Sequence, residues 1–303
     1  MNRKTVLIYL LIFILAFIGF AFVCFPGREA GIRLTEMLKS RRTDLQFAVG
    51  SVKPALPLGL SFQDTIISLN KELKIVPDGV KIGFSPMSLF RSEKKLTVRA
   101  ELNRGLVKGN LKVKSLDPLK ISESEFFLEK ININGFKYHS PLAEVTLSCD
   151  LSGEYHEDLV DDPPGSPAKP LKGKAGRKNP GHGTLVMENF SAHMENSWLN
   201  MINFPEIDFS SLTIEFVRYP QRLVITRCAG RGSMLNLRLK GDIRLASSAQ
   251  KTRLNLTGKI LPDSPYLARF ANQAAIRSRA GNISRNGIEF YIKGTLENPR
   301  IGI

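Results

Sequence analysis

With 303 residues, 43% of them hydrophobic, the chain is long enough for one large β domain or two smaller ones. Its net charge of +15 attracts anionic lipid head groups, nucleic acid or acidic proteins, unless it is only the solvated surface of a basic envelope protein. Cys24, Cys149 and Cys228 are too widely spaced for a CxxC redox pair or a zinc motif, and three cysteines do not indicate a disulfide framework. Cys149 and Cys228 could still pair with each other or act as small buried hydrophobic residues.

An uncharged, almost wholly apolar run occupies residues 5–25, behind the short basic tail Arg3-Lys4. As a helix rising about 1.5 Å per residue it would span about 31 Å, the thickness of a bilayer's hydrocarbon core. A cleaved signal peptide would be shorter and end in small residues, whereas this run ends in bulky ones. We therefore favour an uncleaved transmembrane signal anchor within residues 1–26. Its anchoring side chains are Thr5, Leu7, Leu11, Phe13, Leu15, Phe17, Phe20, Phe22 and Phe25.

The orientation of the anchor rests on the residues that flank it. Arg3 and Lys4 favour a cytoplasmic N-terminus, although Arg28, Arg33 and Lys39 lie on the other side. A short tail before a long apolar run is typical of a signal anchor that exports the remainder of its chain. We therefore expect a single-pass membrane protein with residues 27–303 outside the cytoplasm. The opposite orientation would leave a basic domain in the cytoplasm.

Residues 27–156 form a first β half that opens with a short helix at about Arg28–Lys39. From Asp44 onward apolar and polar residues alternate with a period of two, as in Leu96-Thr97-Val98-Arg99-Ala100. Such alternation indicates one buried and one solvated face, which is typical of antiparallel sheets.

Residues 157–183 interrupt this pattern with five prolines and no aromatic residue. The segment starts acidic and continues basic, and it cannot bury enough apolar surface to offset the entropy of ordering it. The composition predicts a disordered insert or a long loop, with a docking motif as the functional alternative.

Residues 184–303 form a second β half in which a pattern recurs. Leu237-x-Leu239-x-Gly241-x-Ile243 is followed by two similar strands, and a related strand ends the first half. Each glycine falls on the apolar phase, where we expect it to leave a gap and let the sheet bend, often at a bulge. We predict a mainly β fold: a curved, mostly antiparallel sheet, shaped as a half-pipe or a folded-over layer, with one or two short helices. One of these helices would run from about Pro265 to Ser278. The sheet-bending glycines are Gly153, Gly241, Gly258 and Gly294.

The apolar phase of these strands is either an ordinary packed core or a groove for an acyl chain. The candidate groove residues are Leu147, Leu151, Leu237, Leu239, Leu254, Leu256, Phe290 and Ile292.

Motifs for catalysis or cofactor binding are missing from the sequence. The histidines, His139, His156, His182 and His193, form no HExxH or HxH pattern, and His182 falls in the predicted insert. Neither a G-x-S-x-G motif nor a phosphate-binding glycine loop occurs. We therefore expect no enzyme, no catalytic residue, no metal and no cofactor.

Basic side chains share the polar phase of two predicted strands, Lys108, Lys112 and Lys114 on one and Arg238, Lys240 and Arg244 on the other. Such rows either keep a surface strand soluble or contact anionic lipid or acidic partner domains. Nucleic-acid binding is disfavoured because few aromatic residues are interleaved with these cations.

Four segments resemble the type II secretion system protein N family, which is similar in style to AsmA-like envelope proteins. They are the anchor ending in Phe25-Pro26, the run Val52–Phe62 that leads into a strand, the strand Met234–Leu245, and the ending Gly287–Arg300. The resemblance implies a curved β sheet with no catalytic residues. It also implies a single-pass protein of the bacterial inner membrane, with the bulk of its chain in the periplasm, that serves as an accessory component of the apparatus exporting folded proteins across the outer membrane.

Two functions remain open at this point. The first is a membrane-anchored assembly protein that docks other secretion-apparatus proteins. The alternative is a lipid-binding or lipid-transfer module that holds phospholipid in its apolar groove.

Overall fold

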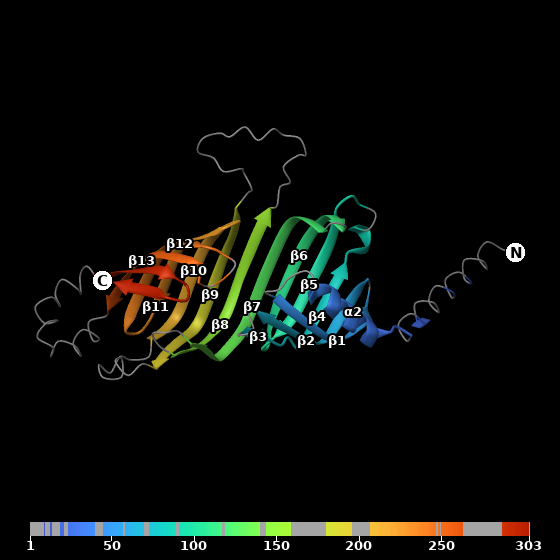
Figure 1. Cartoon of the computed structure of the whole chain (residues 1–303), viewed down its shortest axis with the longest axis horizontal. Helices are drawn as coiled ribbons and strands as arrows, with labels where there is room; N and C mark the ends of the chain where they lie inside the picture. Colours follow the sequence, from blue (N-terminus) through green and yellow to red (C-terminus); the bar gives the residue numbers. More distant parts are fainter. Residues whose placement is uncertain are drawn as a thin grey trace, which may run out of the picture. The chain divides into compact units, whose positions relative to one another are not determined.

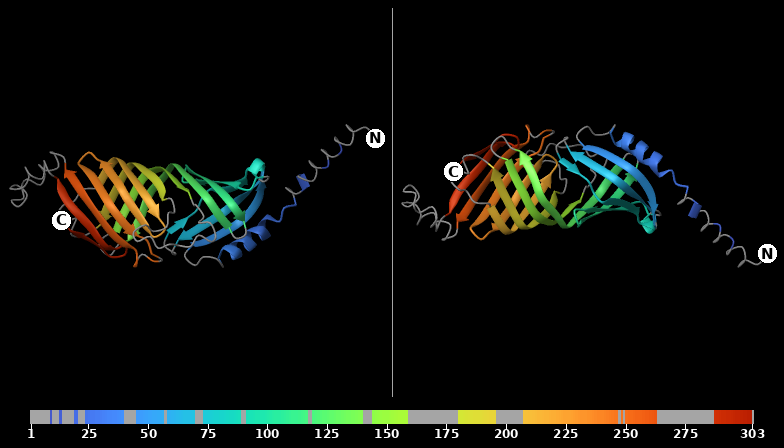
Figure 2. Two further views of the ribbon diagram at one scale, coloured as in Figure 1. Left: turned by 90° about the horizontal axis from the view of Figure 1, so that it is seen from above. Right: turned by 90° about the horizontal axis from the view of Figure 1, so that it is seen from below.

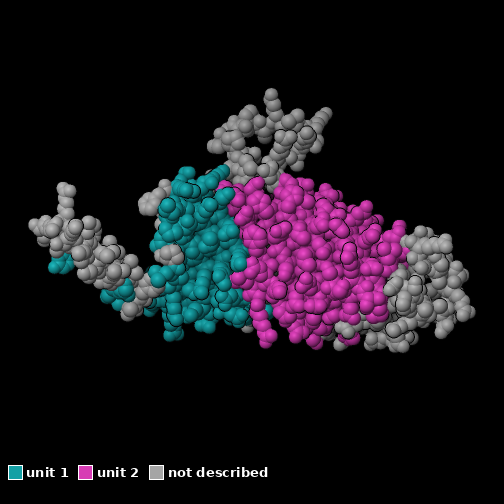
Figure 3. All heavy atoms as spheres, turned by 180° about the vertical axis from the view of Figure 1, so that it is seen from behind, with its two compact units in different colours: residues 1–103, 107–120 teal, residues 104–106, 121–303 magenta. Residues whose placement is uncertain are grey.

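The computed structural model describes residues 9, 13, 19–20, 24–39, 45–56, 58–69, 73–88, 91–116, 119–139, 144–158, 180–195, 207–246, 248, 250–262 and 287–302. The chain divides into two compact units, coloured separately in Figure 3. Unit 1 comprises residues 1–103 and 107–120, and unit 2 comprises residues 104–106 and 121–303.

Unit 1 is an antiparallel sheet with one helix beside it. Its strands follow the order β1-β2-β4-β5-β6, and β3 pairs with the end of β2. Val52, Phe62, Val80 and Ala100 lie in register across four strands and form one row of its buried face. The elements are α2 (Gly27–Lys39), β1 (Leu45–Ala55), β2 (Gly59–Leu69), β3 (Leu73–Ile75), β4 (Gly79–Phe84), a 3₁₀ turn (Pro86–Ser88), β5 (Lys94–Leu102) and β6 (Gly105–Leu116).

Helix α2, which confirms the helix predicted at Arg28–Lys39, covers the open edge of β1 (Figure 2). Gly31 lies so close to this edge that a Cβ atom would be 3.1 Å from the Val49 carbonyl oxygen. The backbone N–H of Val49 donates a hydrogen bond to Thr35 Oγ1 over 3.1 Å. A covered edge cannot pair with another chain, so α2 protects this end of the sheet.

Unit 2 is a long antiparallel sheet that curls over itself (Figures 1 and 2). From β7 to β15, each strand pairs with the next one in the sequence. This confirms the predicted mainly β, curved, antiparallel architecture. The strands are β7 (Leu119–His139), β8 (Glu144–Asp158), β9 (Gly181–Glu195), β10 (Ile207–Tyr219), β11 (Arg222–Arg231), β12 (Leu235–Arg244), β13 (Arg253–Pro262), β14 (Ile288–Thr295) and β15 (Pro299–Gly302).

The predicted insert connects two neighbouring strands of this sheet. β8 continues to Asp158 and β9 begins at Gly181, so both strands extend into the range 157–183. Residues 159–179 lie outside the described residues. His156 pairs with His182 in the β8–β9 register, so the sequence on both sides of the insert belongs to unit 2.

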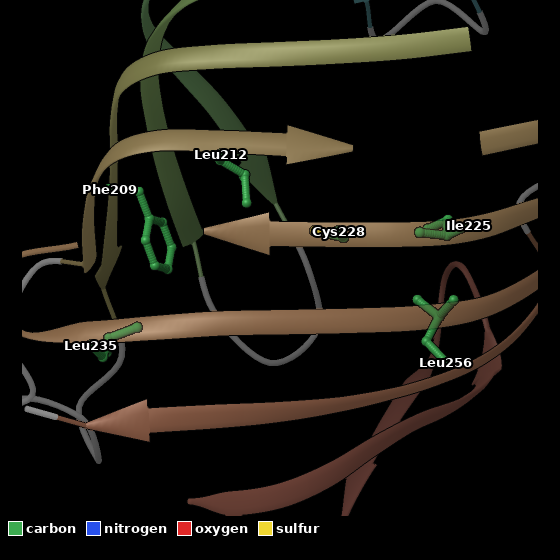
Figure 4. Close-up of a cluster of buried hydrophobic side chains, with 6 residues drawn as sticks. All are labelled: Phe209, Leu212, Ile225, Cys228, Leu235 and Leu256. Carbon is green, nitrogen blue, oxygen red and sulfur yellow. The ribbon is translucent and has the colours of Figure 1, made fainter. Parts of the chain in front are cut away.

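The two faces of the unit 2 sheet differ in polarity, as the alternation predicts. One face, here called the buried face, carries the cluster Phe209, Leu212, Ile225, Cys228, Leu235 and Leu256, whose side chains project from β10 to β13 (Figure 4). The opposite, exposed face carries the charged side chains of the same strands. In β12, for example, Asn236, Arg238 and Lys240 are exposed, whereas Leu235 is buried and Leu237 and Leu239 are partly buried.

Two expectations fall largely outside the described residues. Of the anchoring side chains, Phe13 and Phe20 are exposed and Phe25 is half-buried, while Thr5, Leu7, Leu11, Leu15, Phe17 and Phe22 are not described. Within the part of the chain that the structure describes, no helix has the length and apolar character needed to span a bilayer. The helix predicted at Pro265–Ser278 also lies outside the described residues.

Candidate functional site

The glycines on the buried face lie beside large side chains rather than leaving gaps. Gly258 is opposite Phe290 in the β13–β14 register, and the Phe290 ring occupies the space where a Cβ atom would project. Gly153 is opposite Leu185, and Gly294 is opposite Leu254. Gly241 has a φ of 145° and is paired with Ile225, next to a β-bulge in β11. The expected link between an inward glycine and a bulge is therefore seen at Gly241, whereas the expected gap is filled at Gly258.

The candidate groove residues all lie on the buried face, but they do not form one uniformly buried set. Leu256 is buried, and the other seven, Leu147, Leu151, Leu237, Leu239, Leu254, Phe290 and Ile292, keep intermediate exposure. Leu237, Leu239 and Ile292 pack against the buried cluster. The face thus combines a packed centre with partly accessible apolar side chains around it.

Cys149 and Cys228 are free thiols on this face, in β8 and β11. Three strand spacings of about 4.8 Å separate them along the sheet, far more than the distance of about 7 Å that a disulfide can bridge. Burial raises the pKa of both thiols, with the charge of Asp150 adding to the effect at Cys149. Both therefore act as small buried hydrophobic residues, and their neutral form makes them poor nucleophiles.

A hollow of about 930 Å³ lies over β11, β12, β13 and β14. Two rows of side chains from the exposed face line it, and four of these side chains are cationic. Tyr291 and the hydroxyls of Thr226 and Thr257 add hydrogen-bonding groups. We call this cavity the basic hollow, after its cationic lining residues Arg227, Arg238, Lys240 and Lys259.

Two cations of the basic hollow have carboxylate partners and two do not. Arg227 Nη1 lies 3.5 Å from Glu215 Oε1, and Lys259 Nζ lies 3.9 Å from Glu289 Oε1. Arg238 and Lys240 are exposed and have no ion-pair partner among the described residues. Their charges are therefore available to an external anion. The third basic residue predicted on this strand, Arg244, instead lies 3.9 Å from Asp242.

The other predicted basic row has a different environment. Lys114 is exposed and Lys108 and Lys112 are half-buried on β6, and all three interact with neighbouring groups. The structure thus separates two rows that look equivalent in the sequence.

Side chains of β8 and β10 contact each other across β9 on the buried face. Gly181 and Gly183 carry no side chains, so residues of β8 and β10 meet above them: the rings of Tyr155 and Phe216 stack with centroids 6.1 Å apart. Arg218 Nη1 donates to Glu157 Oε2 over 2.9 Å and to the Tyr155 hydroxyl over 3.2 Å. Burial raises the pKa of Tyr155, and the hydrogen bond from Arg218 opposes this effect.

A second hollow of about 470 Å³ lies on the exposed face over β7 to β11. Its wall includes three residues that lie opposite one another on β7, β8 and β9: Glu125, His156 and His182. The sequence places His182 in a disordered insert, and that expectation is wrong because His182 belongs to β9. The sequence could have indicated that His156 and His182 lie close together, because they stand near the two ends of the insert. If the flanking strands form a hairpin, residues 156 and 182 face each other.

The remaining histidines do not join this group. His193 is exposed near the other end of β9, and the side chain of His139 is not described. The prediction that the protein is not an enzyme stays a prediction.

Comparisons with known proteins identify no relative: no family model, curated protein or solved structure matches the chain.

Proposed function

We propose that the protein is a non-enzymatic docking component of a type II protein secretion apparatus, anchored in the inner membrane with its β units in the periplasm. The observation that carries the docking role is the charge of Arg238 and Lys240 in the basic hollow, which no carboxylate of the described residues neutralises. The secretion context comes from the resemblance of the four sequence segments.

The chemistry of the hollow favours an acidic segment of a partner protein as its ligand. Arg238 and Lys240 offer two separated positive charges, and Arg227 and Lys259 lie beside them on the neighbouring strands; this suits an extended acidic segment better than one small ion. Thr226, Thr257 and Tyr291 can hydrogen-bond a peptide backbone. Because the hollow is open and solvated, we expect its charges to speed association and select the partner more than to supply affinity.

The test is complementation of a deletion strain with charge-reversed chains. We expect the double variant Arg238→Glu/Lys240→Glu to accumulate normally but to reduce the export of type II substrates at least about tenfold, since like charges across an interface are strongly unfavourable. The control is Lys81→Glu, which reverses an exposed cation on β4 of unit 1. Normal export by the double variant would refute docking through this hollow. Normal export by the deletion strain itself would refute the secretion role.

A second candidate function is phospholipid binding on the buried face. It is favoured by the intermediate exposure of seven of the eight candidate groove residues. Lipid extraction and mass spectrometry of the chain purified from membranes, with the variant Leu237→Asp/Ile292→Asp as control, test this function. Stoichiometric phospholipid that the variant lacks would support it, and equal traces in both proteins would exclude it.

The proposed location has its own test. Alkaline phosphatase or green fluorescent protein fused after Ile303 reports the side of the membrane on which the β units fold. Phosphatase activity without fluorescence is the expected result. Fluorescence without phosphatase activity would place the units in the cytoplasm and would contradict the secretion proposal.

A further inference from the structure

Four potential metal-ligating residues form a compact block on the exposed face of β7 and β8. In the register of this pair, Glu123 is opposite Asp158 and Glu125 is opposite His156. Residues directly opposite in an antiparallel pair have Cβ atoms about 5 Å apart and project from the same face. One ligand atom from each of Glu123, Glu125 and His156 lies within 4.8 Å of the other two.

The distance between His156 and Glu125 in this block is compatible with a coordination shell. His156 Nδ1 lies 3.5 Å from Glu125 Oε1. A strong charge-assisted hydrogen bond would measure about 2.8 Å. Two ligands that bind Zn²⁺ tetrahedrally at about 2.0–2.1 Å are separated by about 3.4 Å. The two atoms are thus spaced as neighbouring ligands of one ion.

The second nitrogen of the same ring has a partner of the kind that metal-binding histidines use. His156 Nε2 lies 3.3 Å from Asp158 Oδ1. When Nδ1 binds a metal, the proton resides on Nε2, where a carboxylate can accept it and hold the ring in place. The two ring nitrogens thus lie near different carboxylates: Nδ1 near Glu125 and Nε2 near Asp158.

The block also has an open side. Glu125 and His156 both line the hollow of about 470 Å³, and His182 lines it from the next strand, directly opposite His156. Water or the His182 imidazole can therefore supply a fourth ligand from this direction.

We propose that Glu123, Glu125 and His156 bind a divalent transition-metal ion of the Zn²⁺ class, with Asp158 positioning the imidazole. One imidazole with two carboxylates suits Zn²⁺ and its neighbours better than Ca²⁺ or Mg²⁺, which prefer oxygen ligands alone. The ion would tie β7 to β8 at the C-terminal end of β8. This site is separate from the basic hollow, so it neither requires nor tests the docking function.

Zn²⁺ alone is the probe for this site. The full-length chain, prepared without a histidine tag, is titrated with Zn²⁺ in competition with a chromophoric chelator, and bound zinc is counted by elemental analysis after dialysis. We expect one tightly bound Zn²⁺ per chain. His156→Ala and Glu125→Gln should each weaken it at least about a hundredfold, and Asp158→Asn about tenfold, as for carboxylates that position a ligand.

His193→Ala is the matched control, because it removes another exposed histidine from a strand of the same unit. It should leave the affinity unchanged, and far-UV circular dichroism should show that all variants keep the β fold. His182→Ala reports the fourth ligand: weaker binding assigns it to His182, and unchanged binding assigns it to water, both in agreement with the site. The proposal is overturned if the wild-type chain binds no stoichiometric Zn²⁺, or if His156→Ala binds it as tightly as wild type.

Discussion

At the scale of single residues, the unit 2 sheet is shaped by positions where a strand approaches its neighbour too closely for a side chain. Gly241 is the clearest of them. Its φ of 145° is rare for residues with a Cβ atom, and a Cβ there would overlap the carbonyl oxygen of Asn255 and lie 2.7 Å from Leu256 Cα. Since the obstructing atoms are backbone, no rotation of a neighbouring side chain can make room.

We therefore expect Gly241→Ala to destabilise unit 2 by about 2–3 kcal/mol. Gly135→Ala separates the two causes, because Gly135 has a φ of 65° but open space around the position that a Cβ atom would take, and about 1 kcal/mol should be lost there. Gly79→Ala, with neither constraint, should be neutral or stabilising by up to about 1 kcal/mol. Urea unfolding of the three variants measures the order, and equal losses would contradict this account.

A second prediction at this scale concerns acid stability. Asp150 accepts hydrogen bonds from Asn132 Nδ2 over 2.8 Å and from Asn189 Nδ2 over 3.2 Å, and these bonds lower the pKa of its carboxyl group. Because the pKa of Asp150 is lower in the folded state, its ionised carboxylate stabilises the fold at pH values above the unfolded-state pKa. This contribution is lost as the pH falls through the folded-state pKa.

The wild-type chain should therefore lose more stability than Asp150→Asn between about pH 5 and about pH 2. Thermal unfolding midpoints of both proteins across this range provide the measurement. Parallel curves would show that the charge of Asp150 contributes nothing to folding.

At the scale of elements, helix α2 covers the edge of strand β1 that faces away from β2, and it accepts a hydrogen bond from that edge. Its glycines allow close approach, and Thr35 accepts the hydrogen bond of an amide that has no strand beside it. An unpaired backbone N–H in a partly buried position costs more than an average hydrogen bond contributes.

Thr35→Val keeps the shape of the side chain and removes the acceptor, so it should cost about 1 kcal/mol. It should also accelerate hydrogen exchange at the Val49 amide. Thr35→Ser keeps the hydroxyl and should leave that amide protected. If Val49 exchanges equally in both variants, the hydroxyl does not protect the edge.

Strands and their faces were predictable from the sequence wherever burial follows a simple period, as in Leu96, Val98 and Ala100. The metal-ligand block was not, because it depends on register: bulges between Leu128 and Ile131 and between Ile133 and Phe136 decide which residues of β7 face β8. The basic hollow was predictable only in part. Arg238 and Lys240 stand out in the sequence, but Arg227 does not, because an irregularity between Ile225 and Cys228 sends two successive residues to the exposed face.

At the scale of the whole molecule, the pairing of β8 with β9 predicts that residues 159–179 are dispensable for folding. Replacing them with Asn-Gly, a dipeptide suited to a two-residue hairpin, should preserve the register of His156 with His182. The shorter loop should raise the free energy of unfolding by up to about 2 kcal/mol. Urea unfolding and hydrogen exchange of β8 and β9 test this expectation, and loss of the fold would show that the segment is structurally required.

The order in which the strands of unit 2 pair also bears on how the unit folds. Every strand from β7 to β15 pairs with the strand before it in the chain, so each strand can pair as soon as it has been synthesised. During synthesis from the N-terminus, the chain can add one strand at a time to the growing edge of the sheet. Contacts between strands that are neighbours in the sequence favour rapid folding. A partly emerged chain therefore presents one unsatisfied edge at a time, and that edge moves forward with each new strand.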